Sequence, residues 1–292
     1  MISIIIKGGL GNQIFQVLCA LGYKYKSNKT LILANNLVHT NVHQYNDKEI
    51  TILTLKKIFP DIEFINNVDT THFYKYNEKY NDAFKYNDID IQSTNILLNG
   101  YFISEKYFPD NFLDLYNYHI EQTSNTIKYN TLTNNFQNTY FIHIRLGDYV
   151  NHNLYTINLI EYYNYCINKI KEQDILAKFI ICTNEYGPNF DNYINNFPKN
   201  NEYIIQDINN DALDTLYIMS SCKGGICSNS TLSWLGSYFQ KNKNKNKDFI
   251  FMPYPWVNFI NGFTKDNIMD VYPKWCQIYD TTTTKILDTI SC

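Results

Sequence analysis

The sequence has no surplus of positive charge. Its 292 residues contain 25 Lys and Arg against 28 Asp and Glu, which gives a formal net charge of −3 at pH 7. A protein that grips nucleic acid by its phosphates needs a basic surface, so we expect no nucleic-acid partner. The one basic run, residues 241–247, alternates Lys with Asn and contains no aromatic residue. This pattern is typical of a solvated loop.

Paired cysteines are also missing. The seven cysteines include no CxxC motif, and their odd number leaves at least one thiol unpaired. Cys222 and Cys227 lack the histidine partners that a zinc site commonly uses. Cys19, Cys166 and Cys182 lie in apolar patterns, which indicates core thiols in a reducing compartment.

Long hydrophobic runs are absent as well. The chain opens on a short apolar stretch, residues 2–6, without a basic leader or a cleavage signal. This stretch is too short to cross a bilayer and is typical of a first strand. We therefore expect a cytoplasmic protein without a membrane span.

Strand-like apolar runs alternate with helical patterns along the chain. In the second half the predicted strands are residues 140–144, 178–182, 203–205, 225–227 and 248–252. The predicted helices are residues 156–171, residues 211–220 and a helix that ends at residue 240. This alternation predicts an α/β fold with parallel sheets and right-handed crossovers. In the first half we expect a helix after Ser104. The polar segment 121–139 is the predicted crossing between an N-terminal lobe, residues 1–135, and a C-terminal lobe, residues 136–292.

A glycine-rich turn, Gly8-Gly9-Leu10-Gly11-Asn12-Gln13, follows the first predicted strand. Glycines let the backbone approach a ligand, and the helix that follows offers free N–H groups to an anion. A dinucleotide fingerprint needs a third glycine where Ile14 stands and an acid after the second strand, where residues 34–36 have none. NAD binding is therefore weakly supported. A tight turn without a ligand explains the glycines equally well.

The central block, His143-Ile144-Arg145-Leu146-Gly147-Asp148, ends a predicted buried strand. The carboxyl end of a strand is where an open α/β sheet binds its ligands. Arg145 is always charged, and its planar guanidinium suits a phosphate. The alternatives are a buried Arg145–Asp148 pair that closes a turn at Gly147, and a core histidine at His143.

A polar group, Ser228-Asn229-Ser230-Thr231, stands at the start of a predicted helix. One such residue is enough to cap a helix. Four in succession favour contact with the phosphates or ribose of a ligand, given the preference of helix starts for anions. Trp234, three residues further on, belongs either to the core or to the edge of this site.

The three blocks together resemble the glycosyltransferase family 11 fucosyltransferases, the α-1,2-fucosyltransferase group. Members carry a GGLGNQ-F-Q block, an HxRxGD block and an NS-S/T-x-S-W block, which here are residues 8–16, 143–148 and 229–234. The order and spacing agree over almost the whole chain.

The chain departs from the family pattern at three places. Leu235 replaces a second Trp, Gly224-Gly225 replaces a basic or His-containing pair, and Thr183-Asn184-Glu185 stands where members often have Ser-Asp-Asp. These departures leave another 6-deoxysugar, such as rhamnose, open as the transferred group. A non-catalytic glycan- or nucleotide-binding protein on the same scaffold is a further alternative.

The resemblance implies a GT-B-like fold of two Rossmann-like lobes with parallel sheets and a cleft between them. The N-terminal lobe would take the acceptor and the C-terminal lobe the nucleotide sugar. The implied reaction moves L-fucose, with inversion, from GDP-β-L-fucose to a glycan acceptor, forming an α-1,2 linkage on galactose or a similar residue. Because no membrane anchor precedes the first strand, the resemblance favours a bacterial- or virus-like cytoplasmic member.

The resemblance also implies roles for single residues. Arg145 would neutralise the departing diphosphate, and His143 and Asp148 are the candidates for the base that deprotonates the acceptor. The implied donor-binding residues are Gly9, Gly11, Asn12, Gln13, Thr183, Ser228, Asn229, Ser230 and Thr231. Asp88-Ile89-Asp90 matches the spelling of a metal-binding Asp-x-Asp pair, but we interpret it as a surface turn. We expect no metal and no other cofactor, because Arg145 can do the work of a metal.

Overall fold

The structure, a computed structural model, describes residues 1–39, 48–244 and 249–287. It divides into two compact units, which we call unit 1 (Met1–Ile120 with Asp266–Val271) and unit 2 (Glu121–Lys265 with Tyr272–Cys292). This division falls earlier in the chain than the predicted boundary at residue 135. Residues 245–247 of the predicted basic loop and Cys292 lie outside the described residues.

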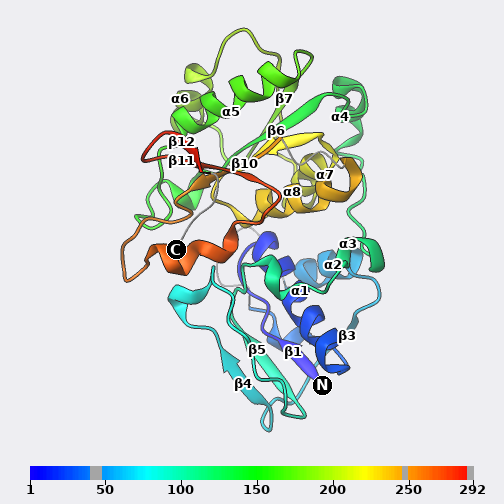
Figure 1. Cartoon of the computed structure of the whole chain (residues 1–292). Helices are drawn as coiled ribbons and strands as arrows, with labels where there is room; N and C mark the ends of the chain where they lie inside the picture. Colours follow the sequence, from blue (N-terminus) through cyan, green and yellow to red (C-terminus); the bar gives the residue numbers. More distant parts are fainter. Residues whose placement is uncertain (40–47, 245–248, 288–292) are drawn as a thin grey trace. The chain divides into compact units, whose positions relative to one another are not determined.

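Unit 1 is an α/β unit built on parallel strands. Its main elements are β1 (Ile2–Ile4), α1 (Leu10–Ser27), β2 (Ile32–Ala34), α2 (Lys48–Ile58), β3 (Glu63–Ile65), β4 (Tyr74–Asn77), β5 (Ile96–Asn99) and α3 (Phe112–Leu115), as Figure 1 shows. The strands β1, β5 and β4 form one parallel sheet, and β2 pairs with β3 in parallel. Helix α1 packs on β1 with a buried face that includes Ile14, Phe15 and Leu18.

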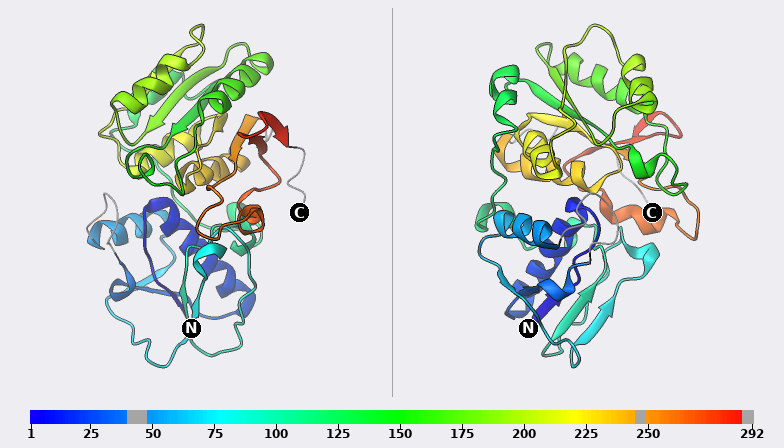
Figure 2. Two further views of the ribbon diagram at one scale, coloured as in Figure 1. Left: turned by 90° about the vertical axis from the view of Figure 1, so that its left-hand side faces the viewer. Right: turned by 180° about the vertical axis from the view of Figure 1, so that it is seen from behind.

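Unit 2 contains a seven-stranded sheet between two layers of helices. Its elements are α4 (Ile127–Thr133), β6 (Thr139–Ile144), α5 (Ile160–Gln173), β7 (Lys178–Thr183), α6 (Pro188–Asn196), β8 (Tyr203–Ile205), α7 (Ala212–Ser221), β9 (Gly224–Ile226), α8 (Thr231–Asn244), β10 (Ile250–Tyr254), β11 (Gln277–Asp280) and β12 (Lys285–Leu287). Helices α5 and α6 (green in Figure 2) cover one face of the sheet, and α7 and α8 (yellow to orange) cover the other. Helix α8 continues to Asn244, so the first part of the predicted basic loop is helical.

The strand order of unit 2 reverses direction once. The order is β12-β11-β10-β9-β6-β7-β8, and all neighbours are parallel except β11 and β12. From β6 the chain moves outward to β7 and β8, then returns to β9 on the other side of β6 and continues to β10. The carboxyl ends of β6 and β9 therefore flank the switch point, where open α/β sheets bind ligands.

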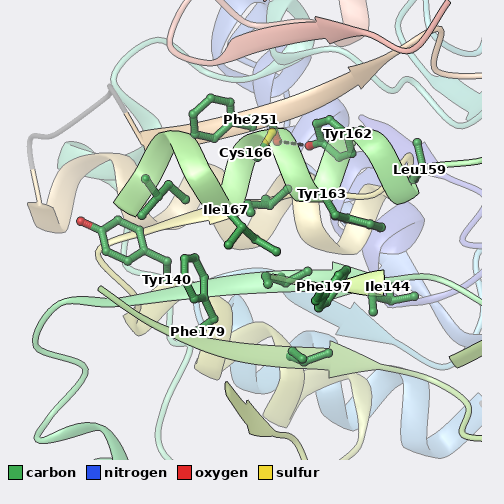
Figure 3. Close-up of a cluster of buried hydrophobic side chains, with 14 of the residues drawn as sticks. Tyr140, Ile144, Leu159, Tyr162, Tyr163, Cys166, Ile167, Phe179, Phe197 and Phe251 are labelled. Atoms are coloured by element: carbon green, nitrogen blue, oxygen red, sulfur yellow. Dashed lines mark hydrogen bonds between the residues drawn. The ribbon is translucent and has the colours of Figure 1, made fainter. Parts of the chain in front are cut away.

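The core of unit 2 centres on β6, in which every residue is buried. Tyr140, Ile142 and Ile144 pack with the apolar side of α5, as Figure 3 shows for Tyr140, Ile144, Tyr163 and Ile167. On the opposite side, the ring of Phe141 lies where a Cβ on Gly225 would be, only 2.1 Å away. Close packing of this ring therefore explains the glycine at position 225. The predicted α/β class with two parallel-stranded units is confirmed.

Candidate functional site

Two of the three sequence blocks meet at the switch point of unit 2. Arg145 directly follows β6, and Ser228-Asn229-Ser230 follow β9 and lead into α8, which begins at Thr231. Because β6 and β9 are hydrogen-bonded neighbours, both blocks leave the same edge of the sheet. The glycine-rich block belongs to unit 1 and is described separately below.

A pocket of about 250 Å³ opens beside Arg145 and lies wholly within unit 2. Its lining includes Asn229 from the β9 loop and the first turns of α5 and α6. Polar groups come from the amides Asn158, Asn189 and Asn192, and no Asp or Glu is among the described residues that line it. Apolar contacts come from Val150, Ile157, Leu159 and Ile160. Arg145 is therefore the charged group of this pocket.

Arg145 keeps part of its side chain accessible. Its Nη2 lies 2.5 Å from Asp148 Oδ1, and 23% of the arginine side chain and 35% of the aspartate side chain remain exposed. The guanidinium carbon lies 5.1 Å from the centre of the Tyr149 ring, a cation–π distance. The ion pair that the sequence offered as an alternative does form, but both side chains are partly exposed, and its arginine lines a pocket.

Arg145 is also the single arginine of the chain, since lysine supplies every other basic residue among the 25. A lysine provides one compact positive charge, whereas the guanidinium offers a planar fork of donors that matches phosphate geometry. The one position that carries this fork is at the switch point. Arg145 is therefore the one residue of the chain that can offer this planar set of donors.

His143 is a buried histidine that joins the two loops. It is 2% exposed, and its Nδ1 lies 2.7 Å from Ser228 Oγ. Burial, together with the charge of Arg145, lowers the pKa of His143 to about 3. A neutral, enclosed imidazole with so low a pKa takes up protons poorly near neutral pH. The geometry favours His143 as a link between β6 and Ser228 over His143 as a base.

The β9 loop is fixed by its own side chains. The Asn229 amide donates to the backbone carbonyls of Tyr155 and Trp256, at 3.0 and 3.1 Å. Ser230 is buried at the start of α8. Trp234 is fully buried and packs against Trp275 with ring centres 5.3 Å apart, so it is a core residue.

The amide of Asn184, which is not among the predicted site residues, holds the β6 loop in place. Asn184 Oδ1 accepts the N–H of Leu146 at 2.8 Å, and its Nδ2 donates to the Leu146 carbonyl at 3.3 Å. Gly147 follows with φ +65°, and a Cβ there would lie 2.8 Å from Asn184 Nδ2. Thr183, at the end of β7, donates through Oγ1 to the carbonyl of Glu185. The only sequence signal for this arrangement was the polar group directly after a strand.

In unit 1 the glycine-rich block forms the turn between β1 and α1. Gly8 has φ +79°, and its carbonyl accepts a hydrogen bond from the Gln13 amide at 2.8 Å. Gly9 has an ordinary φ of −72°, and a Cβ there would meet nothing within 4 Å. The fold therefore requires glycine at position 8 but not at position 9. Gly11 is buried in the first turn of α1, and Asn12 is half-buried.

The Asp-x-Asp segment is an irregular stretch of chain in which both aspartates are exposed. Asp88 accepts a hydrogen bond from the Tyr86 hydroxyl, and Asp90 accepts one from the Gln92 N–H, while Ile89 between them is buried. Over residues 1–39, 48–244 and 249–287, no three His, Cys, Asp or Glu side chains gather in a way that could hold a metal ion. In the same ranges, no helix is both long and apolar enough to span a bilayer.

Comparison with known proteins gives one match in sequence and several in structure. Residues 46–247 match the model of "Glycosyl transferase family 11". No curated protein matches the chain. One similar solved structure is the fucosyltransferase NodZ from Bradyrhizobium, at 13% identity and a TM-score of 0.49, and the alignment covers 80% of this chain and 91% of that chain. Another is a mutant of Arabidopsis thaliana FUT1 in complex with GDP, at 14% identity and a TM-score of 0.47, covering 99% and 78%.

Structural likeness at these scores carries no conclusion about ligand, linkage or mechanism. The family match carries a conclusion about membership, because it spans more than half of the chain and includes the central block and the Ser228–Trp234 segment. The chain belongs to glycosyl transferase family 11.

Proposed function

We propose that this glycosyltransferase moves L-fucose from GDP-β-L-fucose to a sugar hydroxyl, with inversion and without a metal, forming an α-1,2 linkage on galactose or a similar residue. Membership of family 11 and the three sequence blocks support the donor and the linkage. The observation that carries the proposal is Arg145, a partly exposed guanidinium beside a pocket at the switch point.

Arg145 acts on the leaving group. When the bond between sugar and diphosphate breaks, negative charge builds up on the diphosphate, and a fixed guanidinium stabilises that charge. Asp148 and the Tyr149 ring hold the guanidinium in one orientation, so little reorganisation is needed during the reaction. The same edge of the sheet carries the other proposed donor-binding residues of unit 2, which are Thr183, Ser228, Asn229, Ser230 and Thr231. Of these, Ser230 and Thr231 supply neutral hydrogen-bond donors to the phosphates.

Asp148 is the better of the two candidates for the base. Its carboxylate is 35% exposed beside Arg145, whereas the imidazole of His143 is enclosed and bonded to Ser228. The acceptor hydroxyl must lose its proton as it attacks the anomeric carbon, and the carboxylate that is paired with Arg145 can receive it. In unit 1, Gly9, Gly11, Asn12 and Gln13 remain the proposed donor-binding group of the glycine-rich turn.

The test is transfer from GDP-fucose to a panel of galactose-ended acceptors, with EDTA present. We expect a fucoside and release of GDP, and a loss on the order of 100-fold or more in kcat for Arg145→Ala. Lys169→Ala is the matched control, because it removes one positive charge from the exposed side of α5 in the same unit. The absence of fucoside and GDP with every acceptor would contradict the proposal, as would full activity of Arg145→Ala.

The sugar itself needs a separate test, because the chain departs from the family at Leu235 and at Thr183-Asn184-Glu185. A bound ligand raises the midpoint of thermal unfolding by mass action. We expect GDP to raise it, and UDP and dTDP to leave it unchanged. Stabilisation by dTDP alone would point instead to a transferase for another deoxysugar such as rhamnose.

A further inference from the structure

The pocket beside Arg145 extends beyond the reach of the guanidinium, and the rest of its lining has a chemistry of its own. Amide side chains of Asn158, Asn189 and Asn192 form its polar part, and Val150 and Leu159 form part of its apolar side. Amides donate and accept hydrogen bonds, which suits the hydroxyls of a sugar. Because no described Asp or Glu lines the pocket, the pocket attracts neither a cation nor a basic ligand.

We propose that this pocket holds the sugar ring of the activated donor, and that Asn189 and Asn192 on α6 help to select it. The proposal rests on the proposed function, since the sugar is attached to the phosphate that Arg145 binds. The pocket measures about 250 Å³, just below the range of about 300–1,000 Å³ that is usual for ligand sites. It therefore suits one hexose ring better than a purine nucleoside, which joins a bicyclic base to a ribose.

The walls of the pocket are held rigidly, as a selective site requires. Tyr149 and Tyr155 stack with ring centres 4.8 Å apart and an interplanar angle of 18°, and Arg145 lies over the Tyr149 ring. The Tyr163 hydroxyl donates to the carbonyl of His143 at 2.7 Å, which ties α5 to the end of β6. Figure 3 shows Tyr163 and Leu159 at the same end of α5, close to Ile144.

Asn189 is the side chain best placed to act on a ligand. It lines the pocket from the first turn of α6 and is exposed, and its amide has no hydrogen-bond partner among the described residues. Asn192 lies one turn further along α6, where its Oδ1 accepts a weak bond from Asn196 at 3.3 Å. Both amides can therefore turn to sugar hydroxyls without breaking a strong contact within the fold.

The experiment compares two ligands that differ only in the sugar. Dissociation constants for GDP-fucose and for GDP are measured with the wild-type protein, Asn189→Ala, Asn192→Ala and the control Asn195→Ala, an exposed α6 residue that does not line the pocket. One lost neutral hydrogen bond weakens binding about fivefold. We expect each pocket variant to bind GDP-fucose about fivefold less tightly, to bind GDP within twofold of the wild type, and the control to match the wild type for both.

The possible outcomes separate this inference from the proposed function. If both pocket variants lose GDP and GDP-fucose equally, the pocket holds the nucleotide and the inference is wrong. If neither variant loses affinity, the inference is also wrong, while wild-type binding of GDP-fucose leaves the proposed function standing. Wild-type protein that binds neither ligand would overturn both.

Discussion

Replacing Gly147 by Ala tests how the loop that carries Arg145 is held. At φ +65° an alanine costs about 1–2 kcal/mol relative to glycine. Its Cβ would also lie 2.8 Å from Asn184 Nδ2, so Asn184 has to move. That movement gives up two hydrogen bonds to Leu146, each worth about 1 kcal/mol. We expect Gly147→Ala to lower the free energy of unfolding by about 3–4 kcal/mol.

A double-mutant cycle isolates the contact. Asn184→Ala alone should lower the free energy of unfolding by about 2 kcal/mol, because it removes the two hydrogen bonds to Leu146. The double variant should lose about 3–4 kcal/mol, no more than Gly147→Ala, because the same bonds cannot be lost twice. The sum of the single losses would be about 5–6 kcal/mol, so the expected coupling is about 2 kcal/mol.

Urea unfolding followed by tryptophan fluorescence suits this measurement. All three tryptophans, Trp234, Trp256 and Trp275, are buried and lie in unit 2, so their signal reports on the unit that contains the loop. Additive losses in the double variant, with coupling below about 0.5 kcal/mol, would refute the argument. In that case Asn184 would not be the group that limits the size of residue 147.

Three further predictions concern charge. Arg145→Lys keeps the charge but removes the planar fork, so kcat for fucose transfer should fall by at least about tenfold, and wild-type rates would contradict a role for the guanidinium geometry. Burial lowers the pKa of His143 from 6.5 to about 3, so the unfolded chain takes up this proton first. Unfolding free energy should fall as the pH drops from 6.5 toward 3, by up to about 3 kcal/mol at pH 4.5. In urea titrations, His143→Asn should remove the part of this fall that comes from the histidine. If the unfolding free energy of the variant fell with pH as steeply as that of the wild type, the attribution to His143 would be wrong. In unit 1, burial raises the pKa of Glu78 from 4.5 to about 7, so stability should fall as the pH rises from 4.5 through 7. Hydrogen exchange of residues 74–102 at pH 5 and pH 8 measures this fall, which Glu78→Gln should abolish.

The second half of the fold could be predicted from the sequence, and much of the first half could not. The strands β6, β7 and β8 are short apolar runs, which are a strong local signal. Helix α6 was missed because only Phe190 on it is buried, which leaves little apolar periodicity. The predicted helix after Ser104 is wrong. A 3-10 turn at Glu105–Tyr107 and the four-residue α3 stand there, because Pro109 and the left-handed Asn111, at φ +52°, interrupt the chain.

The candidate site, too, could be predicted from the sequence only in part. That Arg145 and Ser228 follow strands could be predicted, because each block ends a recognisable apolar run. That the two strands are neighbours depends on sheet order, which no local pattern encodes. The bond between His143 and Ser228 and the hold of Asn184 on Leu146 join residues that are far apart in sequence. Contacts of this kind can be predicted only when the order and register of the strands are known.

The solitary guanidinium has a practical consequence. A dicarbonyl reagent that condenses with arginine side chains finds a single target in this chain, so the extent of labelling reads out the accessibility of Arg145 directly. A phosphate-bearing ligand seated on that group should shield it in proportion to occupancy.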